Sequence, residues 1–522
     1  MAKNLELTVL KKTLRVVFGT VFGTSALVGI HHRYRKLKNA DASVQDYKRG
    51  LESQLKSLPL KRLQFAYQQA LRSGQQAYLN YPQVNVNVQN NNEYKNNSED
   101  KIATSLTALH TTTMLARPVC WVSGVASMPH NISLIDDDSE SGFGVVGIDA
   151  DKQLVWQTTM PERVHDIVVQ PTANNDDKEA ISNISTNTSN SINHNPSRGV
   201  VVMGRRPSAR FWVLDTATGQ VKYAIKASYK RHFYGHACYS LDGSKLYVTE
   251  NDTVNLIGKI GIYDTQNHYQ KIAEFDSYGI GPHELIMHPD GDTLVIANGG
   301  IKTEQASREE LNLDTMRPSL VYLNRHNGAL LQQVTPEYNQ MSIRHLAMHD
   351  DGTVMIGIQF QGDKHINVPL VLTHQRGEVK FTPLQMPHNQ WQRFHQYIAS
   401  VAVDSQNNLL CVTTPIGGCA AIYDLDTLAL IDSVSLPDCA GASVLQNHIR
   451  DHSDNNQKDQ KDQKDQKAGF IISDGQGQLT TLVIDNPLAP KTAVMNNSEQ
   501  IERIIKDSHS HKMSFDNHLQ AL

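Results

Sequence analysis

The sequence lacks most of the features that mark metal-knuckle, disulfide-rich and nucleic-acid-binding proteins. It has five cysteines among 522 residues, and no two of them form a CxxC pair. Neither a zinc knuckle nor a dense disulfide framework is therefore expected. One disulfide is compatible with the count, but isolated buried thiols are the preferred interpretation. The net charge of −4 offers no electrostatic basis for binding DNA or RNA, so no nucleic-acid partner is expected.

Common catalytic motifs are also absent. The chain has no G-x-S-x-G elbow, Walker loop, HExxH helix or CxxCH haem-attachment string. Assignments as a serine α/β-hydrolase, a P-loop enzyme, a zincin or a haem-attached protein therefore lack support.

An apolar run near the start of the chain, Val16–Ile30, has 15 residues, whereas a membrane-spanning helix needs about 20. Basic residues flank it on both sides, and this pattern favours the apolar core of a signal peptide. Because no clear A-x-A cleavage site follows, residues 1–38 are either a signal sequence that is cut later or an uncleaved membrane anchor. Both alternatives predict export to the periplasm, the second with N-terminal membrane association.

Residues 39–100 are predicted to form a linker. Leucine and tyrosine spacings of three to four indicate helices within 44–80, and residues 81–100 are rich in asparagine. Residues 174–197 and 451–467 are polar and poor in apolar residues, so both are expected to be disordered insertions. Residues 491–522 are assigned to a C-terminal tail.

The remaining chain, residues 101–490, carries a repeat. A polar residue, a short apolar strand, an Asp-Gly turn and a second apolar strand recur at His236, Glu284 and His345, with weaker copies at His165 and Ser400. A second landmark, a strand that ends in Asp or a substitute, occurs seven times: Asp149, Asp215, Asp264, Asn324, His374, Asp424 and Asp485. Spacings of this size predict an all-β, seven-bladed β-propeller. The alternative is a pair of β-sandwiches with coincidental turns.

The polar residue of each repeat opens the innermost strand of its blade, so the ring brings these residues to one mouth of the central channel. The predicted metal ligands are His165, His236, His283, Glu284 and His345. Imidazoles with a carboxylate suit zinc, iron or manganese, and they also suit acid–base chemistry. The alternative is that these side chains only solvate the channel or bond to neighbouring loops.

A set of polar side chains accompanies these positions. The predicted ligand-binding residues are Arg205, Arg206, Arg231, Arg344 and Asn298. Arginine binds carboxylate or phosphate through paired hydrogen bonds, so an anionic ligand, a carboxylate-bearing chelate or an acidic partner loop is expected here. Ion pairs between blades are an equally weighted alternative for each arginine.

Several strings identify the chain as similar to a known family. They include RHFYGHACYSLDG, GIGPHELIMHPDGDTLVIANGGI, LNLDTMRPSLVYLN and SIRHLAMHDDG. They resemble an uncharacterised bacterial family (domain of unknown function) of exported seven-bladed propellers in the WD-repeat and YVTN-like superfamily. Its members often occur beside imelysin-like and ferrous-iron-uptake proteins. The resemblance implies export, an association with iron uptake and such proteins as partners, but no reaction.

The sequence departs from this family in places. Lys11-Lys12 stands where the family often has twin arginines, and IKTEQASRE replaces a loop that carries a histidine and a proline. Pro415–Gly418 replaces a PRGG string, which removes one arginine from the mouth.

Three functions follow as hypotheses. The preferred one is a non-enzymatic accessory protein of metal uptake that binds iron or another divalent metal. The second is a lactonase-like hydrolase, because IRHLAMHDDG looks like an element of propeller lactonases whose arginine and histidine map onto Arg344 and His345. The third is a protein-interaction scaffold that uses the faces of the ring.

Overall fold

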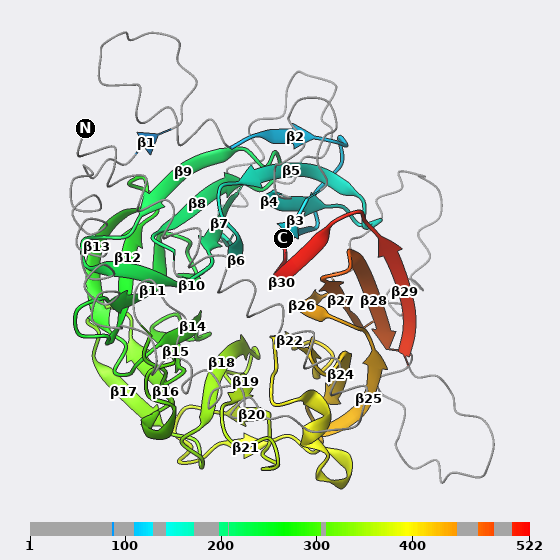
Figure 1. Ribbon diagram of the computed structural model, residues 1–522. Helices are drawn as coiled ribbons and strands as arrows, with labels where there is room; N and C mark the ends of the chain where they lie inside the picture. Colours follow the sequence, from blue (N-terminus) through cyan, green and yellow to red (C-terminus); the bar gives the residue numbers. More distant parts are fainter. Residues whose placement is uncertain are drawn as a thin grey trace, which may run out of the picture. The chain divides into compact units, whose positions relative to one another are not determined.

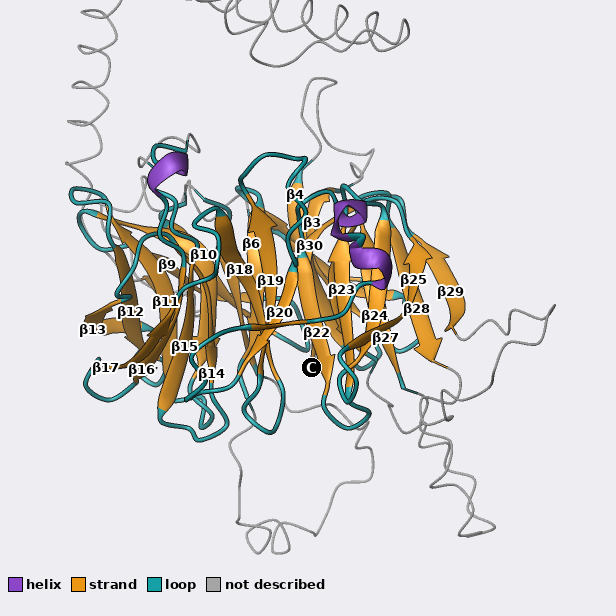
Figure 2. Ribbon diagram, turned by 90° about the horizontal axis from the view of Figure 1, so that it is seen from below, coloured by secondary structure: helices purple, strands orange, loops and turns teal. Residues whose placement is uncertain are grey.

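The computed structural model describes residues 86–87, 109–128, 142–171, 198–206, 208–303, 310–445, 468–484 and 504–522. Within these residues the protein is almost entirely β-structure, arranged as seven sheets of four or five strands. Figure 1 shows the sheets set radially around a central axis, and Figure 2 shows the same ring from the side. The predicted seven-bladed propeller is confirmed, and the β-sandwich alternative is excluded.

The first three blades around the ring contain four or five strands each. Their strands, from the channel outward, are β30 (Ser514–Ala521), β3 (Trp121–Ser127), β4 (Phe143–Ile148), β5 (Leu154–Met160) and β2 (Thr111–Thr113); β6 (Val164–Val169), β7 (Gly199–Gly204), β8 (Arg210–Asp215), β9 (Val221–Lys226) and β1 (Val86–Asn87); and β10 (Arg231–Tyr239), β11 (Lys245–Asp252), β12 (Gly258–Asp264) and β13 (Gln270–Asp276).

The other four blades follow in chain order. Their strands are β14 (Pro282–Met287), β15 (Thr293–Asn298), β16 (Ser319–Asn324) and β17 (Leu330–Val334); β18 (Met341–Met348), β19 (Val354–Phe360), β20 (Val371–His374) and β21 (Thr382–Pro383); β22 (Ser400–Asp404), β23 (Leu409–Thr414), β24 (Cys419–Asp424) and β25 (Ala429–Ser435); and β26 (Cys439–Val444), β27 (Gly469–Asp474), β28 (Gln478–Ile484) and β29 (Ile504–Ser510). The described helices are short 3-10 turns: η2 (Leu313–Thr315), η3 (Pro387–Asn389) and η4 (Trp391–Phe394).

The repeat has a direct structural meaning. The Asp-Gly pairs lie in the hairpins between first and second strands, where Gly243, Gly291 and Gly352 have φ values of 67°, 72° and 89°. Glycine adopts this left-handed backbone at little cost. The Asp landmark ends the third strand of a blade, and in β8 the Asp215 carboxylate accepts the N–H groups of Ala217 and Thr218.

The ring closes between the two ends of the described chain. Strand β30 pairs antiparallel with β3, with Trp121 opposite Ala521 and Ser123 opposite Leu519. This finding corrects the assignment of residues 491–522 to a tail, because β29 and β30 are integral strands of two blades. The outer strand β29 is mostly exposed, so it has no apolar pattern by which the sequence marks it, and its ladder with β28 stabilises it.

The core consists of apolar layers between adjacent blades. Trp121, Trp156 and Trp212 are at most 2% exposed and lie in these layers. All five cysteines are buried and free, which confirms the prediction of isolated thiols.

No helix among the described residues is long and apolar enough to span a membrane. The predicted signal segment, the helices of 44–80 and the insertions 174–197 and 451–467 lie outside the described residues.

Candidate metal centre

The first strands of four consecutive blades bring the predicted ligands together. His236, His283, Glu284 and His345 each place one potential ligand atom within 4.8 Å of all the others. His165, His236 and His518 form a second set within the same limit. The ring centroids of His236 and His283 are 4.7 Å apart, and those of His165 and His236 are 4.6 Å apart. The cluster therefore combines residues from five strands: β6, β10, β14, β18 and β30.

β-Bulges in the first strands aim these side chains into the channel. In β14 the ladder passes from Pro282 to Glu284, which leaves His283 as the inserted residue, and in β18 it passes from Ile343 to His345 around Arg344. Such a bulge re-aims side chains at a functional site. In β10 the bulge includes Gly235, with φ of 109°, and a Cβ there would lie 2.7 Å from His165 Cδ2. Gly235 therefore makes room for the His165 ring.

The register in β6 corrects one detail of the repeat, which placed His165 at the same position as His236, Glu284 and His345. Val164 pairs with Gly204 and Ile167 with Val202, so His165 and Asp166 together oppose Met203. His165 thus belongs to the bulge, as His283 does. Ser400, by contrast, lies in a regular ladder opposite Thr413, and the structure brings no metal-binding side chain from β22 to the cluster.

Sequence reasoning missed two residues of the cluster, Asp166 and His518. Asp166 Oδ2 lies 3.4 Å from His236 Nδ1 and accepts the backbone N–H of Ala237, and Asp166 Oδ1 lies 3.7 Å from His518 Nδ1. Asp166 follows His165 as Glu284 follows His283, and that parallel was a usable signal. His518 could be found only by assigning the C-terminal strand to the first blade.

Several ring nitrogens of the cluster lack a hydrogen-bond partner. They are His165 Nδ1, both nitrogens of His236, His283 Nδ1 and His518 Nε2. The 3.4 Å contact of His236 with Asp166 is close enough for an ion pair but lacks hydrogen-bond geometry. A buried polar atom left unsatisfied costs about 1–3 kcal/mol, so a cluster of them requires a function or a ligand.

Burial sets the protonation states of the cluster. It lowers the pKa values of His165, His283 and His345 well below the ordinary range and that of His518 to about 4. These imidazoles are therefore neutral at pH 7, which is the form that binds metals. Burial also raises the pKa of Glu284 to about 7.

His236 is the exception among the imidazoles. Burial alone would lower its pKa, but the carboxylates of Asp166 and Glu284 outweigh this effect and raise the pKa. His236 is also the residue that both ligand sets share, so the two carboxylates act on the imidazole common to them.

Glu284 and His345 orient each other. Glu284 Oε2 lies 3.1 Å from His345 Nδ1 and accepts the Leu346 backbone N–H at 3.1 Å. His345 is 3% exposed and His236 is 0% exposed, whereas His165, His283 and Glu284 are partly exposed to the channel.

The predicted arginines Arg205, Arg206 and Arg344 differ in the groups that surround them. Arg206 donates to Thr303 Oγ1 at 3.3 Å and lies over the Tyr234 ring, and Arg344 immediately precedes the candidate ligand His345. Arg205 instead lies 3.7 Å from the buried Asp516 carboxylate, to which Arg163 donates two hydrogen bonds.

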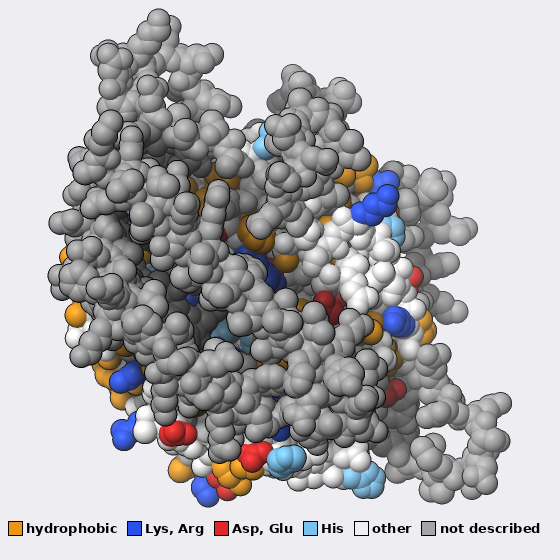
Figure 3. All heavy atoms as spheres, viewed as in Figure 1, with side chains coloured by type: hydrophobic (Ala, Val, Ile, Leu, Met, Phe, Trp, Pro, Cys, Tyr) orange, Lys and Arg blue, Asp and Glu red, His pale blue; other side chains and the backbone are white. Residues whose placement is uncertain are grey.

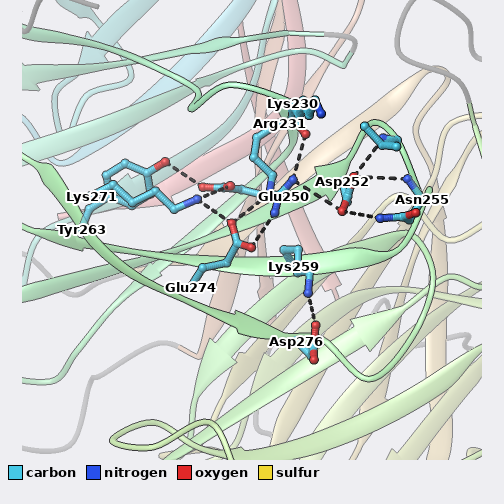
Figure 4. Close-up of polar contacts among 11 residues, drawn as sticks. Lys230, Arg231, Glu250, Asp252, Asn255, Lys259, Tyr263, Lys271, Glu274 and Asp276 are labelled. Carbon is cyan, nitrogen blue, oxygen red and sulfur yellow. Dashed lines mark hydrogen bonds and ion pairs between the residues drawn. The ribbon is translucent and has the colours of Figure 1, made fainter.

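Arg231 and Asn298 serve the scaffold. Arg231 donates two hydrogen bonds to Glu274 within its own blade, as part of a network with Lys271 and Glu250 (Figure 4). Asn298 is fully buried and donates to the Ser277 carbonyl. Their local partners give both residues a structural role.

Comparison with known proteins adds a family. One solved structure, hydrazine synthase of Kuenenia stuttgartiensis, is 14% identical over 63% of this chain and 86% of its own, with a TM-score of 0.42. A chain of a mitotic checkpoint complex is 12% identical over 60% of this chain and 76% of its own, with a TM-score of 0.40. No curated protein sequence matches. Residues 185–522 match a family described as a protein of unknown function, DUF1513. The chain therefore belongs to this family, as the sequence strings indicated.

Proposed function

We propose that this propeller binds one divalent transition-metal ion in its channel, through His236, His283, Glu284 and His345. The observation that carries the proposal is the convergence of these donors within 4.8 Å, with ring nitrogens that no described residue satisfies. Three imidazoles and a carboxylate suit iron(II), manganese(II) and zinc(II). The bound ion would act as a Lewis acid or be carried as cargo.

The second set, His165, His236 and His518, lies next to the first set because both contain His236. It shares His236 with the first set but offers no carboxylate within its limit. We place the ion in the first set because that set has four donors and includes Glu284. The Asp166 carboxylate beside His236 and His518 would then hold these two rings in position.

Metal content tests this proposal. Protein purified without chelator is analysed by inductively coupled plasma mass spectrometry and then titrated with Mn(II), Zn(II) and anaerobic Fe(II). About one ion per chain is expected in the wild type, and the His236→Ala, His345→Ala double variant should bind none. A Glu284→Gln variant, which preserves side-chain volume, should lose at least tenfold in affinity, by analogy with substitutions around metal sites.

The control replaces two exposed histidines, His326 and His365, by alanine, and it should bind metal as the wild type does. Circular dichroism of each variant separates a lost site from a lost fold. Wild-type protein that binds none of the three ions, or a folded double variant that binds them equally well, would refute the proposal.

We also propose that the protein serves iron uptake in the periplasm, with imelysin-like or other iron-uptake proteins as partners. This part rests on the family resemblance of the sequence. Fractionation of cells that express the full chain tests the location. Affinity capture from the periplasmic fraction, followed by mass spectrometry, tests the partners. Recovery in the cytoplasm alone would contradict the proposal.

One observation favours the hydrolase as a second candidate. The Glu284 carboxylate contacts His345 Nδ1 and would orient this ring as a general base. Turnover in a screen of lactones and esters, lost in His345→Ala, would support an enzyme. Absence of turnover in metal-free and metal-loaded protein would leave metal binding as the function.

A further inference from the structure

One ion in the channel would leave several buried ring nitrogens without a partner. An ion held by the set that contains Glu284 uses one nitrogen of His236. The other nitrogen of His236, together with His165 Nδ1 and His518 Nε2, then still has no hydrogen-bond partner among the described residues. These three residues form the second set, whose potential ligand atoms lie within 4.8 Å of one another. Each unsatisfied buried atom costs about 1–3 kcal/mol, so three of them at one place indicate a further ligand.

His236 differs from a histidine that holds a single metal ion. Such a histidine binds the metal with one ring nitrogen and donates from the other to a carboxylate, a carbonyl or water. His345 fits this description, because its Nδ1 lies 3.1 Å from Glu284 Oε2 and its other nitrogen remains for a metal. His236 is 0% exposed, and neither of its nitrogens has a hydrogen-bond partner among the described residues. Both nitrogens of this ring are therefore available as ligands.

The second set is held by three strands, with His165 on β6, His236 on β10 and His518 on the closing strand β30. The ring centroids of His165 and His236 are 4.6 Å apart, and that of His518 is 5.0 Å from each of them. The three rings therefore form a nearly regular triangle. A Cβ at Gly235 would lie 2.7 Å from His165 Cδ2, so this triangle needs a glycine beside it. Figure 3 shows histidine and basic side chains in the hollow at the middle of the ring.

A carboxylate lies on the same side of the cluster. Asp166 Oδ2 is 3.4 Å from His236 Nδ1, and Asp166 Oδ1 is 3.7 Å from His518 Nδ1. The backbone N–H groups of Ala237 and Ile167 donate to this carboxylate and fix its position. A negative charge held beside two of the three imidazoles attracts a cation to them. The second set thus combines three nitrogen donors with a fixed counter-charge.

We propose that the channel binds a second metal ion through His165, His236 and His518, and that the His236 ring bridges the two ions. This inference rests on the proposed function, which places the first ion in the set with Glu284. The His236 ring releases its N–H protons to solvent and bridges as an imidazolate, whose negative charge offsets part of the charge of the ions. Three imidazoles with an open fourth position suit zinc(II) or copper(II). The second ion binds in a separate, weaker step, because it has fewer donors and the first ion repels it.

Isothermal titration of metal-free protein with Zn(II) tests the second ion. The wild type should bind one zinc ion in a first step and another in a second step that is at least about tenfold weaker. His165→Gln and His518→Gln should each abolish the second step and keep the first. Glu284→Gln should instead weaken the first step. His326→Gln, at an exposed histidine, should keep both steps, and circular dichroism of each variant checks that it is folded.

Copper(II) tests the bridge, because two copper ions joined by one imidazolate couple magnetically. Wild-type protein loaded with two copper ions should give the electron paramagnetic resonance spectrum of a coupled pair, and folded His518→Gln should give that of a single ion. Two ions without coupling would overturn the bridge.

The outcomes separate this inference from the proposed function. A wild type that binds one zinc ion, lost in the double variant of His236 and His345, overturns the second ion and leaves the proposed function standing. A wild type that binds no ion overturns both. A second step that persists unchanged in folded His165→Gln and His518→Gln would place the second ion outside this set and overturn the inference.

Discussion

Acid should destabilise the metal-free protein through His518, and the effect can be isolated. Burial lowers the pKa of His518 from its ordinary value of 6.5 to about 4, and the side chain is 13% exposed. A group whose pKa is depressed by folding contributes stability that is present above pH 6.5 and is lost as the pH falls towards 4. The complete loss corresponds to about 3 kcal/mol, and about 2 kcal/mol of it should be gone at pH 5.

The assay is urea unfolding of chelator-treated protein at pH 7.5 and pH 5. Other buried histidines also contribute to the loss in the wild type, so the informative quantity is the difference between the wild type and His518→Gln. The variant should lose about 2 kcal/mol less than the wild type over this interval. His326→Gln, at an exposed histidine, should behave as the wild type. Equal losses in His518→Gln and wild type would show that folding does not favour the neutral imidazole, and the burial argument would be wrong.

Three further predictions concern the scaffold. Asp516→Asn should lower the free energy of unfolding in urea by about 1–3 kcal/mol, because it removes the carboxylate that Arg163 binds across the ring closure; an unchanged value would mean that closure does not depend on this pair. Arg231→Ala should cost a similar amount yet leave the Mn(II) stoichiometry at the wild-type value, and a loss of metal instead would return Arg231 to the site. The five cysteines should react with Ellman's reagent only after unfolding, because burial raises the pKa values of Cys120 and Cys439 to about 12; rapid reaction of native protein would contradict their burial.

The fold could be predicted because its signal is local and repeated. An Asp-Gly pair between apolar strands marks a hairpin wherever it occurs, and Gly243, Gly291 and Gly352 all adopt the backbone that such turns need. Strand β29 carried no such signal. Its exposed side chains have no apolar alternation, so only its partner strand defines it.

The candidate site could be predicted only in part, for a different physical reason. Ring geometry brings equivalent positions together, and this principle located His236, Glu284 and His345. It could not specify the bulges that shift the register by one residue, such as the one in β6 where His165 and Asp166 together oppose Met203. The sequence also does not show which side chain an arginine contacts. Arg231 and Arg344 were both predicted to bind a ligand, but Arg231 donates to Glu274 in its own sheet.

The closing strand gives the site an order of assembly. Arg163 and Asp516 contact each other across 353 positions of the chain, and contacts at such separations form late because a long loop must first be closed. During synthesis, His165, His236, His283 and His345 leave the ribosome well before His518. Full metal affinity should therefore appear only after β30 has paired with β3. Retention of the ion would then report that the ring is closed.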